Sequence, residues 1–326
     1  MAEAVDIREL NIIIEQQSAF ITNITSGMER VIVGQKHLID SLLISLLSNG
    51  HILLEGVPGL AKTQAITALA KCIDAKFSRI QFTPDLLPAD ILGTMIYSPK
   101  EEIFSVKKGP IFSNFVLADE INRAPAKVQS ALLEAMQERQ VTIGETTYKL
   151  EEPFLVLATQ NPIEQEGTYP LPEAQLDRFM FMLWLDYPSF EEEVDILKRT
   201  TTGKTAEVRQ ILSMEDILSI QSLVRDIPVS DNVYEYVVKL VGKTRLSLPN
   251  NEKAKKYLSW GAGPRASQYL IMGAKCHAAL TGKYSPDIED VNAVAVPVLR
   301  HRIVLNYSAQ AEGFTTESII KDLINE

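Results

Sequence analysis

The chain has 326 residues, more than one hydrophobic core ordinarily contains, so its length predicts two domains. Its 46% hydrophobic and 23% charged residues are typical of globular proteins and exclude collagen-like and disordered chains. The net charge of −10 disfavours binding of the whole surface to a nucleic acid backbone. We expect no membrane span, because no apolar stretch approaches the roughly 20 residues that cross a bilayer. The acidic N-terminal residues are unlike a signal peptide, so we expect a cytoplasmic protein.

Strands and helices alternate in the first part of the chain. We expect a helix over residues 39–47, a buried strand over 51–55 and a helix over 62–73. Further buried strands are expected over residues 78–82, 115–118 and 154–159, with a helix over 126–138. This alternation predicts a parallel sheet with helices on both faces.

Two polar segments interrupt this alternation. Residues 94–106 and 140–150 alternate polar and apolar side chains around a turn, which predicts two hairpins; the second turn is Gly144-Glu145. After Tyr187-Pro188 the pattern is helical only. We expect helices over residues 190–199, 215–225, 231–244, 264–280 and 288–302, with Pro264 and Pro286 in first helical turns. The predicted domains are an α/β domain of residues 1–187 and a smaller all-α domain of residues 188–326.

An octapeptide rich in glycine joins the first strand to the next helix. Glycines allow successive N–H groups to surround a polyphosphate, and the helix N-terminus adds positive potential. Lys62 would bind the β and γ phosphates, and Thr63 would be a ligand of Mg²⁺. The usual pattern has glycine before the lysine, but alanine also tolerates helical φ and ψ angles there. The predicted phosphate loop consists of Gly56, Val57, Pro58, Gly59, Leu60, Ala61, Lys62 and Thr63.

Polar side chains follow the later strands of the predicted sheet. Asp119 would hold a water of Mg²⁺, and Glu120 would accept a proton from the attacking water. A strand that ends in Asp-Glu is common by itself, so this prediction depends on the phosphate loop. Asn161 follows the next strand and could hold that water against the γ phosphate. Arg178 precedes the last strand and could stabilise, from a neighbouring subunit, the charge that grows in the transition state.

Several motifs together resemble the MoxR branch of the AAA+ ATPases. They are Val33-Gly34-Gln35, GVPGLAKT, LADEINRA, ATQNP, LPEAQLDRF and GAGPRA. The resemblance implies a P-loop NTPase sheet with hairpin inserts, followed by a helical lid.

The resemblance also implies roles for single residues. Val33 and Gly34 would border the adenine, Asn161 would be the first sensor, and Arg178 would be the finger that acts across a subunit boundary. Arg265 would be the second sensor, in a lid helix. In relatives with a hairpin such as that of residues 94–106 this arginine can act across the interface, so the subunit whose ATP it contacts stays open.

These observations predict an Mg²⁺-dependent ATPase that forms a homo-oligomer, expected to be a ring of six subunits. The other site residues can come from one edge of the sheet, whereas Arg178 lies on the far side, so a neighbour must complete the site. Arg123 is a second candidate for the interface. The resemblance implies chaperone-like remodelling, maturation or assembly of client proteins, together with a protein that bears a von Willebrand factor A domain.

Three alternatives stay open at this point. The hairpins could be pore loops of a nucleic-acid motor, but residues 140–152 contain one Lys and three Glu, which disfavours that function. A metal-chelatase motor subunit would differ only in its partners. An ATP-controlled scaffold would use the nucleotide to switch partner affinity, with slow turnover.

Overall fold

The computed structural model describes residues 24–29, 32, 34–56, 62–100, 102–162, 167–201, 210–248 and 251–326. The chain divides into two compact units by its contacts. The first holds Asn23–Phe179 and Leu183–Leu218, and the second holds Met180–Met182 and Ser219–Glu326. Compact units and domains need not coincide, so the domain boundary expected after residue 187 stays a prediction. Within the described residues, no helix combines the length and apolar character that crossing a membrane requires.

A five-stranded sheet forms the centre of the first unit. In spatial order its strands are β2 (Phe77–Gln81), β5 (Phe115–Asp119), β8 (Leu155–Gln160), β1 (Ile52–Gly56) and β9 (Phe181–Leu185). The pairs β2–β5, β5–β8 and β8–β1 are parallel, which confirms the predicted parallel sheet. The four strands whose bounds were predicted are shifted by at most one residue. The inner strands are nearly completely buried, as expected for a sheet covered on both faces.

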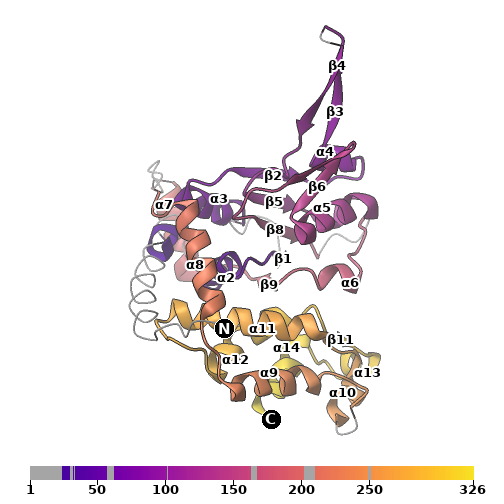
Figure 1. The fold of residues 1–326 in the computed structure, drawn as a ribbon. Coiled ribbons are helices and arrows are strands. Elements are labelled where there is room, and N and C mark those ends of the chain that lie inside the picture. The colour runs from indigo at the N-terminus through magenta and orange to yellow at the C-terminus, as the bar shows by residue number, and fades with distance from the viewer. Residues whose placement is uncertain are drawn as a thin grey trace, which may run out of the picture. The chain divides into compact units, whose positions relative to one another are not determined.

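Helices flank this sheet. α3 (Lys62–Ile73) and α5 (Ala126–Glu138) have the predicted bounds and lie on opposite sides of the sheet in Figure 1. α2 (Lys36–Leu47) begins three residues earlier than expected. α3 and α5 each bury an apolar stripe and have polar residues at the opposite positions, the pattern of a helix packed on a sheet. α2 is instead buried on almost every side from Leu38 to Leu47.

Both predicted hairpins are present. The first is formed by β3 (Gly93–Ser98) and β4 (Ile103–Lys108), and it projects from the sheet in Figure 1. The second is formed by β6 (Gln140–Ile143) and β7 (Thr146–Lys149), and its turn residue Gly144 has a φ of 63°. A Cβ at Gly144 would lie 2.5 Å from Met95 Sδ, so the turn of the second hairpin packs closely on the first.

The polypeptide after β9 is mostly helical. α7 (Phe190–Thr200) and α8 (Met214–Asp226) come first, followed within the second unit by α9 (Asp231–Lys243), α10 (Glu252–Tyr257), α11 (Pro264–Leu280), α12 (Ile288–Leu299), α13 (Tyr307–Ala311) and α14 (Thr316–Asn325). A short antiparallel pair, β10 (Leu258–Trp260) and β11 (Val304–Leu305), was not predicted, nor were α10, α13 and α14.

Two expectations for this region were wrong. α12 ends at Leu299, three residues before the expected end, because the N–H of Arg302 bonds the carbonyl of Leu299 and not that of Val298. The Arg302 side chain donates to the carbonyl of Val298 instead. Pro286 lies outside the helix, since Asp287 is the N-cap and accepts from the N–H of Asp290. Pro264, by contrast, occupies the first turn of α11, as predicted.

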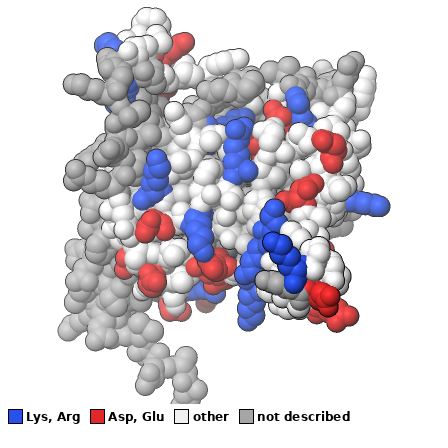
Figure 2. Space-filling model, turned by 90° about the horizontal axis from the view of Figure 1, so that it is seen from above, with Lys and Arg blue, Asp and Glu red and all other residues white. Residues whose placement is uncertain are grey.

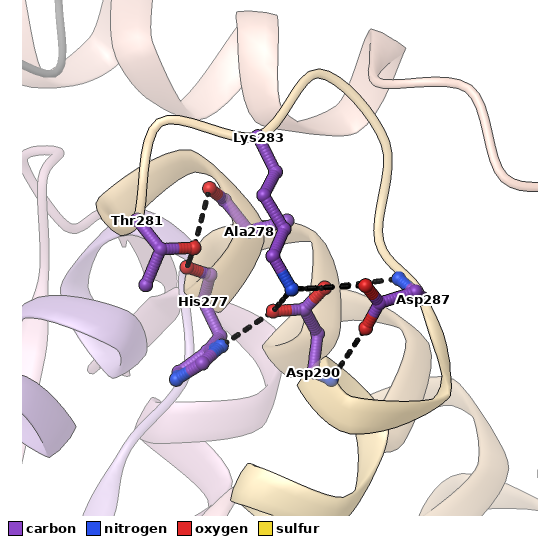
Figure 3. A network of polar contacts seen from close by, with 6 residues as sticks. All are labelled: His277, Ala278, Thr281, Lys283, Asp287 and Asp290. Atoms are coloured by element: carbon purple, nitrogen blue, oxygen red, sulfur yellow. Dashed lines mark hydrogen bonds and ion pairs between the residues drawn. The ribbon is translucent and has the colours of Figure 1, made fainter.

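A buried carboxylate joins α11 to α12 (Figure 3). Asp290 is fully buried and accepts hydrogen bonds from His277 Nδ1 at 2.7 Å and from Lys283 Nζ at 3.1 and 3.2 Å. The N–H of Asp287 donates to it as well, at 2.9 Å. Asp290 therefore fastens the end of one helix, the connecting loop and the start of the next helix together.

Candidate functional site

The predicted phosphate loop connects β1 to α3. Residues 57–61 lie outside the described residues, so the positions of Val57, Pro58, Gly59, Leu60 and Ala61 are not placed, and the same is true of Val33. Both ends of the loop are placed. Lys62 Nζ donates to the carbonyl of Gly56 at 2.8 Å, so the lysine reaches back across the loop to the end of the strand.

Lys62 and Thr63 form the first turn of α3, and both are half-buried. Burial lowers the pKa of Lys62, because the charged ammonium is desolvated. The negative charges of Asp119 and Glu120 oppose this shift and raise the pKa. The lysine thus faces the two acids at the carboxyl end of β5, as expected for groups at one edge of a parallel sheet.

Asp119 is the last residue of β5, and both of its carboxylate oxygens are hydrogen bonded. Thr159 Oγ1 on β8 donates to Oδ1 at 2.7 Å, and Arg79 Nη2 on β2 donates to Oδ2 at 2.5 Å. The Asp119 side chain is only 19% exposed. The two neighbouring strands therefore fix the carboxylate from both sides.

Glu120 directly follows the strand, with a φ of 58° that turns the chain out of the sheet. Its N–H donates to Thr159 Oγ1 at 2.9 Å. Its Oε2 accepts from Gln81 Nε2 at 2.9 Å and from Arg123 Nε at 3.0 Å. Arg123 is thus an ion-pair partner of the acid in this structure, and its role at an interface stays a prediction.

Asn161 lies at the same edge of the sheet. It follows Gln160, which stands opposite Glu55 in the parallel register of β1 and β8. The next residue of β1 is Gly56, where the phosphate loop begins. The structure therefore brings Gly56, Lys62, Asp119, Glu120 and Asn161 to the carboxyl ends of β1, β5 and β8.

Gly34 belongs to this edge as well. A Cβ at Gly56 would lie 2.7 Å from the carbonyl oxygen of Leu185, so the carboxyl ends of β1 and β9 meet. The segment that follows β9 contacts residues 34 and 35: Gln35 Nε2 donates to the carbonyl of Asp186, and Gly34 lies against Glu192. With a φ of 65° and the Glu192 carboxylate 2.0 Å from a would-be Cβ, a side chain at Gly34 would be strained and would displace this carboxylate.

Arg178 lies elsewhere. It sits between α6 (Glu173–Leu176) and β9, three residues before this strand begins. Because the carboxyl end of β9 meets that of β1, the amino end of β9 is at the opposite edge of the sheet. Arg178 is therefore distant from the acids of its own chain. Arg265 belongs to the second unit, where it lies in the first turn of α11.

Three side chains that hold the acids were not predicted from the sequence: Arg79, Gln81 and Thr159. Arg79 and Gln81 are exposed on either side of the buried Ile80, an alternation that indicates one polar face of a strand. Thr159 is a buried hydroxyl in an otherwise apolar strand, a residue that usually has a hydrogen-bond partner. These signals were present, but the order of strands was needed to interpret them.

The donor atoms at this edge suit a magnesium ion bound together with phosphates. A hydroxyl at Thr63 and a carboxylate at Asp119 are oxygen ligands, and Mg²⁺ commonly takes only one or two protein ligands beside phosphates and water. Among the residues placed in the structure, no group of three or more His, Cys, Asp or Glu side chains could hold a metal ion. Cys72 and Cys276 are both buried free thiols.

Comparisons with known proteins identify the family of the chain. Residues 51–181 match the family described as "ATPase family associated with various cellular activities (AAA)", and residues 251–323 match the AAA lid domain. Chaperone MoxR1 of Mycobacterium tuberculosis is 50% identical over 91% of this chain and 79% of its own length. The uncharacterized protein YeaC of Bacillus subtilis is 44% identical over 91% of both chains.

A solved structure is similar over nearly the whole length. It is the crystal structure of a Cytophaga hutchinsonii protein assigned as an ATPase, with a TM-score of 0.90 and 48% identity, over 98% of this chain and 96% of that one. The parallel sheet, the helical second unit and these relatives lead to one conclusion. The chain belongs to the MoxR family of AAA+ ATPases.

Proposed function

We propose that this protein hydrolyses ATP in the presence of Mg²⁺, at sites completed by a neighbouring copy of the chain. The proposal rests on one observation: the carboxyl ends of the strands bring together Lys62, Asp119, Glu120 and Asn161. These are the residue types that bind a triphosphate, hold its metal, activate a water and position it.

Each residue has a separate task in this proposal. Lys62 binds the β and γ phosphates; its ammonium is already partly desolvated, so it exchanges a carbonyl partner for a charged one. Thr63 and Asp119 hold the metal, which neutralises charge on the phosphates. Glu120 takes the proton of the attacking water, and Asn161 orients this water towards the γ phosphate. Gly34, with Val33 beside it, borders the adenine.

The placement of Arg178 supports the shared site. A guanidinium at the opposite edge of the sheet cannot stabilise the γ phosphate of its own chain, but it can reach the site of the next copy in a ring. We propose a ring of six copies, in which each junction binds one ATP. Arg265, in the second unit, contacts the nucleotide bound by one of the two adjoining subunits.

Mixing two inactive variants tests the shared site. We expect Arg178→Ala to bind ATP normally and to lose most turnover, whereas Lys62→Ala loses binding. A mixture of the two contains junctions with an intact Lys62 and an intact Arg178, so part of the activity should return. Arg199→Ala, which removes an arginine paired with Asp195 on α7, is the matched control and should keep its turnover. Full activity of Arg178→Ala alone, or no recovery in the mixture, would contradict the proposal.

Protein clients fit the surface better than nucleic acid does. The projecting β3–β4 hairpin carries exposed apolar side chains, among them Ile103 at 53% and Phe104 at 64%. Figure 2 shows Lys and Arg interspersed with Asp and Glu on the face seen from above, whereas a nucleic-acid motor favours a continuous basic surface. We therefore propose chaperone-like remodelling of client proteins, with a von Willebrand factor A domain protein as a partner.

A trapping experiment tests this role. Glu120→Gln should bind ATP without cleaving it, and affinity capture in ATP should recover the client. The double variant Lys62→Ala with Glu120→Gln is the control, because it cannot bind the nucleotide and should recover none. Binding of DNA that weakens steeply with salt would favour the nucleic-acid motor instead. Slow hydrolysis even with a saturating client would indicate an ATP-controlled scaffold.

A further inference from the structure

Arg79, on the edge strand β2, binds the carboxylate of Asp119. Its Nη2 lies 2.5 Å from Asp119 Oδ2 and 3.0 Å from Gln81 Oε1. In the parallel register of β2 and β5, Gln81 stands opposite Asp119, so Arg79, two residues earlier, is on the same face of the sheet. The guanidinium therefore reaches the acid from the neighbouring strand.

The two oxygens of Asp119 have different surroundings. On one oxygen the partner is the neutral hydroxyl of Thr159, which is buried on β8. On the other it is the full positive charge of Arg79, whose side chain is 50% exposed. The carboxylate therefore already has one cation as a partner.

A carboxylate has about four lone-pair sites, so the number of acceptors does not prevent a guanidinium and a metal from sharing Asp119. Charge does oppose the sharing, since two cations on one carboxylate repel each other at this short separation. We propose that Arg79 competes with the divalent cation for Asp119, and so raises the Mg²⁺ concentration that the protein needs for metal-dependent ATP binding. This inference rests on the proposed function, because it takes Asp119 as the acid that holds the metal.

Arg79 is a positioning residue in this inference, since it acts only through Asp119. Gln81 gives it a second acceptor, so a displaced guanidinium has a neutral partner on its own strand. An arginine that merely supported the carboxylate would have the opposite effect, because its removal would loosen Asp119 and weaken metal binding. The direction in which the required Mg²⁺ concentration changes when Arg79 is removed therefore distinguishes competition from support of the carboxylate.

The test measures binding of a fluorescent, non-hydrolysable ATP analogue by anisotropy during a Mg²⁺ titration, so no turnover is involved. We expect Arg79→Gln to lower the midpoint in Mg²⁺ by about tenfold relative to the unmodified chain. Arg79→Lys keeps the charge and should lower it much less. Lys76→Gln is the matched control: Lys76 directly precedes β2 and pairs with Glu151 at 3.1 Å. This variant removes one positive charge at the amino end of the same strand, away from Asp119, and should leave the midpoint unchanged. An unchanged or higher midpoint for Arg79→Gln overturns the competition.

A fourth variant separates this inference from the proposed function. Asp119→Asn should abolish the dependence of nucleotide binding on Mg²⁺. If it does so and Arg79→Gln fails to lower the midpoint, only the competition is wrong. If Asp119→Asn keeps the full metal dependence, Asp119 is not the metal-holding acid, and both the competition and the metal assignment fail.

Discussion

His51 accepts a hydrogen bond from the backbone N–H of Val156 through Nδ1, at 3.0 Å. Its proton must then be on Nε2, which donates to the carbonyl of Met136 at 3.2 Å. The ring is buried, and it bridges the start of β1, the end of α5 and β8. Burial, followed by the positive charge of Arg139, lowers the pKa of His51 well below its ordinary value.

The first prediction follows from this tautomer. A neutral His51 in the folded state, against an ordinary pKa of about 6.5 in the unfolded state, means that the unfolded chain takes up a proton first as the pH falls. We expect the contribution of His51 to the free energy of unfolding to be constant above pH 7. Below about pH 6.5 it should decrease, by at most about 1.4 kcal/mol per pH unit. Denaturant unfolding at pH 7.5 and 5.5 measures it. In His51→Gln the decrease should be smaller, and an unchanged slope would show that His51 is not responsible.

The second prediction concerns the Asp290 cluster of Figure 3. Asp290→Asn keeps the shape of the side chain but removes the charge that binds His277 and Lys283. We expect a loss of about 3 kcal/mol in unfolding free energy, at the low end for a broken buried ion pair, because Lys283 can turn to solvent. Asp287→Asn keeps the helix cap at an exposed position and should cost under about 1 kcal/mol. Equal losses for the two variants would contradict this account.

Thr159 offers the third prediction. Thr159→Val removes the hydroxyl that donates to Asp119 and accepts from the N–H of Glu120, with almost no change in volume. We expect kcat to fall at least tenfold with little change in the dissociation constant for ATP, since both acids lose a fixed partner. Thr142→Val removes a hydroxyl that pairs with Thr147 on the exposed β6–β7 hairpin, and it should leave kcat unchanged. Steady-state kinetics measure kcat, and a binding titration measures the dissociation constant for ATP. An unchanged kcat in Thr159→Val would contradict the prediction.

The fourth prediction compares two glycines that have nearly the same positive φ angle. Gly34 and Gly144 have φ angles of 65° and 63°, so alanine at either position is strained and should cost at least about 1 kcal/mol of stability. Only Gly34 lies beside Glu192, whose carboxylate caps the first turn of α7. In the proposed function only Gly34 borders the adenine, so a side chain there would disturb the nucleotide site. We expect Gly34→Ala to weaken ATP binding about tenfold and Gly144→Ala to leave it unchanged. Equal affinities in an ATP titration would show that Gly34 does not border the nucleotide.

Local patterns were enough to predict the main strands, α3, α5 and the acid pair of the site. Gly56, Lys62, Asp119 and Glu120 are recognisable because turn residues and charges directly follow buried strands. Arg79 and Gln81 could not be assigned in this way, because their contact with the acids depends on β2 lying beside β5, and strand order is not a local property. α10, α13 and β10 are too short to show a period. α14 does have an amphipathic period and a capping residue at Thr315, so it could have been predicted.

Helix α5 connects the acid pair to the β6–β7 hairpin, and this connection has a mechanical consequence. α5 begins six residues after Glu120 and runs for 13 residues to the first strand of the β6–β7 hairpin, whose turn touches Met95 on the other hairpin. A helix of this length is a stiff rod of about 20 Å, so a tilt of about 5° at its base displaces its far end by about 2 Å. The backbone that carries the acid and the two hairpins are therefore two ends of one lever arm.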